Sequence, residues 1–446
     1  GQETLKDKKV IRIFGIAWSD TKEGSVYFRA PPDSAKQTIY VCVECDSSVP
    51  SPERCEVCAN DSPKLIKVDA YKPKYYIANW TDHPKYDGNI ETKNQKVLED
   101  YRIENTSQST YFRNFSLESN QGIITSINTN EMKGFNFIKT SIEDLTGEHR
   151  GKSSGVWFKQ NNSADVEDPG ESIQGIYCEK FTDFLKISCK SPPNYMQEAE
   201  DTSYQALKDA WLSLGELFKK GIELREDIEP SELAIKSKYD GGQWVIYLSD
   251  TLDNGAGYSS RYSEPGEFKE LCAYINDRII EGFKEESHLD CLTSCHLCLR
   301  NYHNRIEHHR LSWRLGVELF NAMYTNSLTL LSEPFWDSVV KKYIPTLLGS
   351  SIGKRLSIEQ YEGRSFYRLV HDQELQFAIL PWHPFEFGGR EMILFQNRLR
   401  SDLNHTNVYP ICPNEFNSSP MTVSQSVSEK YRDDVRASKN KNGSKH

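Results

Sequence analysis

Seven of the eleven cysteines fall into two short groups whose spacing suits the binding of metal ions. The first group is Cys42-x2-Cys45-x9-Cys55-x2-Cys58. Each CxxC knuckle turns two sulfurs toward one point, and two knuckles supply the four thiolates of a tetrahedral site. The spacing and the strand-like residues before the first knuckle favour zinc over an iron–sulfur cluster. Such a site is structural because it has no open position for a substrate, and the redox alternative for CxxC lacks a neighbouring βαβ pattern.

The second group is Cys291-x3-Cys295-x2-Cys298, which offers three thiolates and needs a fourth ligand. Two-residue gaps suit a metal ion better than disulfides between distant strands. The residues within reach along the chain as a fourth ligand are His288, His303, His308 and Cys272. Because any single histidine can equally have a surface or capping role, the residue types leave this choice open. We therefore predict two zinc ions per chain, both structural.

A basic run follows the second cysteine group. Its arginines are Arg300, Arg305, Arg310 and Arg314. The whole chain has a net charge of -10, so no global basic field attracts it to nucleic acid. Local contact with phosphate groups is the functional interpretation of the run. The alternative is a solvated helix face that pairs with Glu307 and Glu318.

The remaining motifs do not predict a catalytic centre. The sequence contains no Walker A, GxSxG or HExxH motif. The glycine-rich run 250–258 lacks the Lys-Ser/Thr of a phosphate-binding loop, so we interpret it as a tight turn that lets the backbone approach a neighbour. His383, Glu386 and Asp402 are the residue types of a metal-dependent nuclease, but scattered polar groups of this kind usually lie at the surface.

Hydrophobic periodicity predicts the elements that position these motifs. Before residue 190 short apolar runs predict strands, at 10–14, 25–28, 122–127, 134–138, 155–159, 175–178 and 181–187. Apolar residues then recur at intervals of three and four over 204–218, and Gly221 is expected to end that helix. The short apolar run 244–248 predicts a buried strand. Pro265 suits the first turn of the helix that leads to the second cysteine group. The stretch 311–324 is apolar on two sides and should be buried on both.

The C-terminal part has an α/β pattern. A strand over 375–380 precedes a helix over 391–403 and a strand over 408–411. The polar stretch 82–109 reads as a loop or exposed linker. The tail 418–446 is rich in serine, lysine and asparagine, and its composition predicts disorder.

The predicted fold class is α+β, with an N-terminal zinc ribbon, a β-rich segment, a helical Cys-cluster zinc domain and a C-terminal α/β segment. These segments are expected at 1–70, 71–200, 201–330 and 331–417, with the disordered tail at 418–446. No apolar run is long enough to span a membrane, and the polar start lacks a secretory hydrophobic region, which predicts a cytoplasmic protein. The first residue is glycine and not methionine, so we expect a tag remnant or a cut there.

Two linked motifs resemble the cysteine-rich MZB domain. They are Asp250-Thr-x3-Gly-Ala-Gly-Tyr258 and, after a helix, Cys291-x3-Cys295-x2-Cys298-Leu-Arg-x-Tyr302-x-Asn304-x3-His308-x2-Leu311. That domain occurs at the C-terminus of many bacterial DEAD/DEAH-box helicases, such as MrfA, and in the DISARM anti-phage protein DrmB. The resemblance covers roughly residues 40–324, and it includes the upstream four-cysteine ribbon. The chain departs from the family pattern at Asn254 and Ser312, and it has three cysteines where four are usual.

The resemblance implies a function that the residues alone do not. It favours His308 as the fourth ligand, because His308 occupies a recurrent family position. It implies a non-catalytic zinc-binding subunit or C-terminal region that assembles with a DNA helicase/ATPase in a bacterial anti-phage defence system and helps engage DNA. Neither a membrane nor a small-molecule substrate is expected as a partner. The alternatives are a divergent metal-dependent nuclease in the C-terminal part and a purely structural interaction module.

Overall fold

The structure is a computed structural model that has the predicted mixed α+β fold. The residues that it describes are 3–6, 9–22, 25–42, 48–49, 65–78, 97–103, 109–130, 132–135, 137–140, 156–159, 172–192, 201–240, 243–283, 285, 288, 291–325, 333–347, 356–371, 375–403, 406–418 and 420–443. The chain forms two compact units. The first comprises Gly1–Asn105 and Gln121–Thr182, and the second comprises Thr106–Asn120 and Asp183–His446. In the described part of the chain, no helix is long and apolar enough to cross a membrane.

The first unit is built from β-strands, as its alternating apolar pattern predicts. One of its sheets contains β1 (Glu3–Lys6), β2 (Lys9–Lys22), β3 (Ser25–Arg29), β7 (Tyr75–Ala78), β11 (Phe137–Thr140) and β12 (Val156–Lys159). A second sheet contains β4 (Lys36–Cys42), β5 (Ser48–Val49), β6 (Leu65–Tyr71) and β8 (Val97–Ile103), with parts of β10 (Phe115–Asn128) and β13 (Ile173–Cys189). Strand β8 lies within the stretch that was expected to be a loop. It pairs with β10 and buries Leu98. The polar residues around this strand led the sequence analysis to predict a loop.

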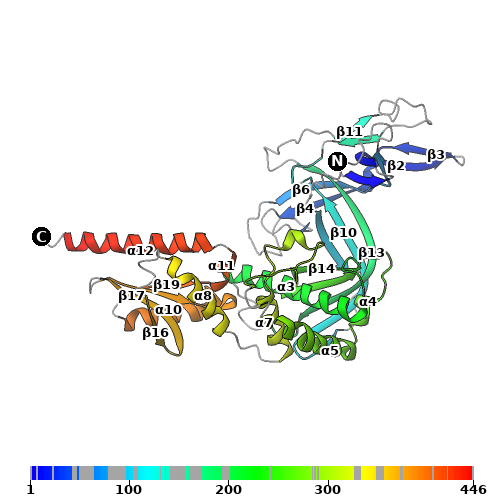
Figure 1. Cartoon of the computed structure of the whole chain (residues 1–446). Helices are drawn as coiled ribbons and strands as arrows, with labels where there is room; N and C mark the ends of the chain where they lie inside the picture. Colours follow the sequence, from blue (N-terminus) through cyan, green and yellow to red (C-terminus); the bar gives the residue numbers. More distant parts are fainter. Residues whose placement is uncertain are drawn as a thin grey trace. The chain divides into compact units, whose positions relative to one another are not determined.

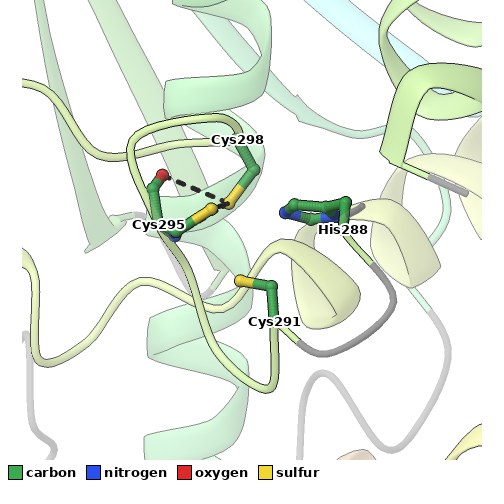
Figure 2. Close-up of side chains that lie close together, drawn as sticks. All are labelled: His288, Cys291, Cys295 and Cys298. Atoms are coloured by element: carbon green, nitrogen blue, oxygen red, sulfur yellow. Dashed lines mark hydrogen bonds between the residues drawn. The ribbon is translucent and has the colours of Figure 1, made fainter. Parts of the chain in front are cut away.

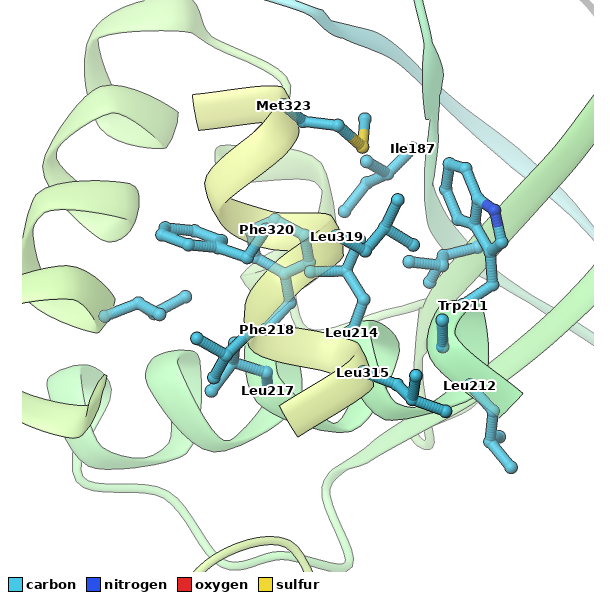
Figure 3. Packing of buried hydrophobic residues seen from close by; sticks show 14 of the residues in the cluster. Ile187, Trp211, Leu212, Leu214, Leu217, Phe218, Leu315, Leu319, Phe320 and Met323 are labelled. Carbon is cyan, nitrogen blue, oxygen red and sulfur yellow. The ribbon is translucent and has the colours of Figure 1, made fainter. Parts of the chain in front are cut away.

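In the second unit, helices pack on a sheet that includes the last residues of β13. β13 pairs with β15 (Gln243–Asp250), which pairs with β14 (Leu233–Asp240). Every residue of β15 after Gln243 is buried, which confirms the buried strand predicted there. Helices α3 (Asp201–Glu226) and α7 (Trp313–Tyr324) pack together, and Figure 3 shows Phe218 of α3 beside Phe320 of α7. α7 is buried on both of its apolar sides, as predicted.

Helix α3 continues past Gly221, where the sequence predicted its end. Gly221 does not end the helix; it allows the helix that carries Leu271 and Ile275 to approach α3 closely. A Cβ atom at Gly221 would lie only 2.7 Å from Cγ1 of Ile275 and 3.1 Å from Cδ1 of Leu271. The crowded side of α3 therefore needs a residue without a side chain, and the helix runs on to Glu226.

The helix that leads to the second cysteine group begins at Pro265, as predicted. Proline occupies the first turn of α5 (Pro265–Tyr274). The helix continues through a π-helical segment, η2 (Ile275–Ile280), into α6 (Glu281–Phe283). This continuous helix delivers Phe283 to the edge of the second cysteine group.

The C-terminal part is the predicted α/β arrangement (Figure 1). Strands β16 (Ser357–Tyr361), β17 (Arg364–His371) and β18 (Leu375–Pro381) are antiparallel neighbours, and β19 (Asn407–Ile411) joins β18 in parallel. Helix α10 (Arg390–Asp402) connects the two parallel strands, since parallel neighbours need a crossover. Helix α8 (Glu333–Leu347) packs on β18, and α11 (Pro413–Ser418) follows β19.

The tail that was expected to be disordered forms helix α12 (Pro420–Gly443). Val423, Val427, Tyr431 and Val435 recur at every fourth position and lie on the cluster made by α8 and the C-terminal sheet. Positions four apart share one face of a helix, so this narrow stripe supplies the packing. The polar composition of the other faces hid the stripe from a composition-based prediction.

Candidate metal centre

Four metal-binding side chains come together just after α6. They are His288, Cys291, Cys295 and Cys298, and their ligand atoms all lie within 4.8 Å of one another. Figure 2 shows the three sulfurs and the imidazole ring facing a common point. His288 and Cys298 are buried, and the other two cysteines are half-buried. The cluster can hold one metal ion, and no second cluster of this kind occurs among the described residues.

The ring of His288 is oriented as a metal ligand requires. Its Nδ1 lies 3.0 Å from the carbonyl oxygen of Phe283, the last residue of α6. A carbonyl can only accept, so Nδ1 carries the proton and Nε2 keeps its lone pair. Nε2 is buried without a hydrogen-bond partner, a costly arrangement for a polar atom. A metal ion bound by Nε2 removes that cost, and the carbonyl fixes the tautomer as an outer partner does in zinc sites.

The loop that carries the cysteines, residues 291–312, is here called the metal loop. Its start is fixed by Trp313, whose indole N–H donates to the carbonyl oxygen of Cys291 at 3.0 Å. The His288 ring lies beside two aromatic rings, with centroid distances of 5.3 Å to Phe283 and 5.0 Å to Trp313. Lys220 of α3 donates to the carbonyl oxygens of Leu297 and Cys298. Three helices thus hold the ligands in place before any metal binds.

The thiols of the cluster interact with each other and with two nearby cations. Cys291 donates a hydrogen bond to Cys298, which lowers the pKa of Cys298 to about 5 and raises the pKa of Cys291. The backbone N–H of Cys295 also donates to the Cys298 sulfur, at 3.0 Å. Burial lowers the pKa of Lys220, and it lowers that of Arg314 to about 10. Their positive charges offset part of the excess negative charge that three thiolates bring to a divalent cation.

The structure brings together three of the four ligands predicted for this site, and His288 completes the set in place of His308. The Nε2 of His308 lies 3.0 Å from the carbonyl oxygen of Asn301 and 2.9 Å from Oδ1 of Asn304. His308 therefore braces the metal loop. The other two candidates also lie outside the cluster: His303 is exposed, and Cys272 is buried in the helical core.

The predicted four-cysteine ribbon falls largely outside the described residues. Cys42 is described and lies at the end of β4, opposite Leu65 of β6. Cys45, Cys55 and Cys58 lie in segments that the structure does not describe. The ribbon and its zinc ion stay a prediction.

Two of the four arginines predicted to contact DNA are engaged inside the protein. Arg310 forms ion pairs with Asp209 at 3.0 Å and with Glu307 at 2.8 Å. Arg314 is half-buried, with its guanidinium 4.0 Å from the ring centre of Trp313. Helix α7 begins at Trp313, so Arg310 precedes the helix that carries Arg314.

The other two arginines lie earlier on the metal loop. Arg300 donates to Oγ of Ser294 at 2.8 Å and to the carbonyl oxygen of His308 at 3.3 Å. Arg305 stacks on Tyr302, with its guanidinium 4.4 Å from the ring centre. DNA contact by any of the four arginines stays a prediction.

The glycine-rich run 250–258 is a tight turn, as interpreted from the sequence. The carboxylate of Asp250 accepts hydrogen bonds from the backbone N–H groups of Ala256 and Ser259, at 2.7 and 2.9 Å. Gly255 has a φ of +77°, and a Cβ atom there would lie 2.0 Å from the carboxylate of Asp183. The turn thus brings the backbone against a neighbouring strand.

Two of the three residues considered for a nuclease, His383 and Asp402, make separate contacts. His383 is buried and lies 3.1 Å from the carboxylate of Glu318, while its Nδ1 accepts the N–H of Phe385. The carboxylate of Asp402 instead accepts a hydrogen bond from Tyr361 at 2.5 Å. In the described part of the chain these groups do not form a metal-binding cluster.

Sequence reasoning missed the residues that support the site. Lys220 and Trp313 were expected only as parts of helices, and their contacts with the metal loop depend on tertiary packing. His288 was one of the four open candidates, and the sequence held a signal in its favour, because His288-x2-Cys291 repeats the two-residue gap of Cys295-x2-Cys298. Two such gaps in tandem are the pattern of paired metal knuckles.

Comparison with known proteins gives limited matches. No protein-family model and no curated protein matches the chain. Among solved structures, the chain is similar to the crystal structure of the DUF1998 helicase MrfA bound to DNA, with 13% identity and a TM-score of 0.32. This match covers 51% of the present chain and 25% of the helicase. A second match is MrfA bound to DNA and AMPPNP, with 11% identity, a TM-score of 0.22, and coverage of 50% and 22%.

Proposed function

We propose that the chain is a non-catalytic zinc-binding module that assembles with a DNA helicase/ATPase of a bacterial anti-phage defence system and helps the complex engage DNA. The observation that carries the proposal is the closed set of one imidazole and three thiols at 288–298, within the stretch that resembles the MZB domain. Zinc prefers such a set in tetrahedral geometry, and four protein ligands leave no position for a substrate. A second zinc ion belongs to the predicted ribbon.

The role of the site in this proposal is positional. A bound zinc ion supplies a cross-link between His288 and the metal loop. Lys220 and Trp313 hold the metal loop against α3 and α7, so the cross-link fixes the position of the loop on these two helices. A fixed loop presents its basic side chains at constant positions, which favours phosphate contact at a small cost in conformational entropy.

The proposal is tested by metal analysis and by assembly. The purified chain is expected to contain two zinc ions, to hydrolyse no ATP alone, and to co-elute with the helicase encoded in its genomic neighbourhood after co-expression. Iron in place of zinc, or ATPase activity abolished by a point mutation within this chain, would overturn the non-catalytic zinc module. Loss of co-elution with zinc content intact would overturn the helicase partner only.

A further inference from the structure

Tyr302 is the most exposed aromatic side chain in the described part of the chain, with 71% of its surface accessible. It lies on the metal loop, four residues after Cys298. Tyrosine more often covers part of its ring against neighbours while its hydroxyl reaches water. An aromatic ring held this far out on a braced loop is available to a binding partner.

Two neighbouring side chains define the surroundings of the ring. The guanidinium of Arg305 lies 4.4 Å from the ring centre, which is the geometry of a cation–π contact. The His303 ring meets Tyr302 edge-on, with centroids 5.8 Å apart and an interplanar angle of 89°. Arg305 occupies one face of the tyrosine ring, and the high exposure of the residue places the opposite face toward solvent.

The backbone under this pair is held by two asparagines. Oδ1 of Asn301 accepts the N–H groups of His303 and Asn304, at 2.8 and 3.0 Å. Oδ1 of Asn304 accepts the N–H of Asn301 at 2.9 Å, and its amide donates to the carbonyl oxygen of Leu299 at 2.8 Å. Asn304 is itself buried. A ring on such a braced turn loses little freedom when it binds a flat partner.

The charge of the metal loop selects the kind of partner. The metal loop contains three arginines and four histidines but only one acidic residue, Glu307, in a chain whose net charge is -10. Arg310 pairs with Glu307, so the one carboxylate of this stretch is already engaged. An aromatic ring with a stacked arginine in a locally basic loop fits nucleic acid better than an apolar protein surface.

We propose that Tyr302 and Arg305 form a stacking platform for an unpaired base of single-stranded nucleic acid. This inference rests on the proposed function and specifies how the loop would engage its substrate. In a duplex each base is covered by its neighbours, whereas an unpaired base offers a whole face to a tyrosine ring. Arg305 then contacts the adjacent phosphate or extends the stack, and the platform reads no particular sequence.

The test measures the affinity of the zinc-loaded chain for a labelled single-stranded oligonucleotide and for the duplex of the same sequence. The single strand is expected to bind more tightly. Tyr302→Ala should weaken its binding by about 5- to 150-fold, the range for loss of one base–aromatic stack. Tyr302→Phe should retain it, because the ring is kept. Arg305→Ala should reduce the slope of log affinity against log salt by roughly 0.7 for one lost phosphate contact on a single strand.

Tyr111 provides a matched control. It is a second exposed tyrosine with a cation over its ring, since Nζ of Lys190 lies 4.8 Å from the ring centre, but it lies outside the metal loop. Tyr111→Ala should leave the affinity unchanged, and zinc content verifies that each variant is folded at the site.

Each other outcome overturns the platform in a different way. Equal affinities of wild type and Tyr302→Ala would remove the platform and leave DNA engagement by other residues. If the wild type binds neither oligonucleotide, the stacking platform is also excluded. Metal content and co-elution with the helicase then still test the zinc module independently. If Tyr302→Ala abolishes co-elution with the helicase but not DNA binding, the ring belongs to a protein interface.

Discussion

Replacement of His288 by alanine tests which histidine completes the metal site. The change removes one of the four ligand atoms that lie within 4.8 Å of one another. It also removes a ring that lies between Phe283 and Trp313. We expect the variant to lose zinc from this site under conditions in which the wild type keeps it.

The size of the effect follows from the ligand set. Structural zinc sites have apparent binding free energies of about 10–16 kcal/mol, so an equal share for one of four ligands is roughly 3–4 kcal/mol. That share corresponds to about a 100- to 1,000-fold loss of zinc affinity. The lost aromatic contacts add about 0.5–1.5 kcal/mol each to the destabilisation, and this part persists when zinc is absent.

The assay is competition with a chromogenic chelator, with total zinc measured in parallel. With the predicted ribbon loaded, zinc should fall from two ions to one per chain in His288→Ala. His288→Cys restores a fourth soft ligand and should recover most of the affinity. His308→Ala is the matched control, because it loses hydrogen bonds within the metal loop, worth about 1 kcal/mol each, but no ligand. Zinc retained by His288→Ala and lost by His308→Ala would refute the assignment.

Three further outcomes are expected. Gly221→Ala should destabilise the protein by about 1–3 kcal/mol in urea unfolding, because its Cβ atom would overlap Ile275. Gly282→Ala is the control, since a Cβ atom there meets open space. Equal urea midpoints for the two variants would refute the crowding at Gly221. Burial raises the pKa of Glu216 from 4.5 to about 7, so the folded state holds this proton more tightly than the unfolded state. The free energy of unfolding of the wild type should therefore fall by up to about 3 kcal/mol relative to that of Glu216→Gln as the pH rises from about 4.5 to 7. Parallel profiles of unfolding free energy against pH would contradict this. Cys45→Ser should release the ribbon zinc and expose that segment to limited proteolysis; unchanged zinc content would exclude the ribbon.

Local patterns predicted many of the elements but not β8, α8, β16, β17 or α12, and tertiary contacts decided most of what was missed. Pro265 and the apolar run of β15 act through their own backbone and burial, so their sequence signals were reliable. Gly221 has the same local signature as a helix end, and only the approach of Ile275 gives it another role. Helix α12 is held by apolar residues at every fourth position. The prediction of disorder used only the overall composition of the tail, which does not show this spacing.

The metal site shows where sequence information ended. Its cysteines were predicted from spacing alone, because knuckle geometry is local. The fourth ligand was open, since several histidines lie at comparable distances along the chain. The choice depends on which histidine has one ring nitrogen in a hydrogen bond and the other directed at the three sulfurs. For His288 the carbonyl oxygen of Phe283 accepts the Nδ1 proton, which leaves Nε2 for the metal ion. The preference for His308 rested on a family position, and in this fold that residue braces the loop.

The π-helical segment Ile275–Ile280 lets the helix carry one residue more before Phe283 without changing the direction of that residue. An α-helix turns the chain by about 100° per residue, whereas the wider π-turn accommodates one residue more. Six residues of the π-helical segment therefore turn the chain about as far as five residues of a regular α-helix. Deletion of Asn276 would let this stretch return to α-helix while the carbonyl of Phe283 still faces His288. A one-residue change in the length of this helix is thus a change that the metal site can tolerate.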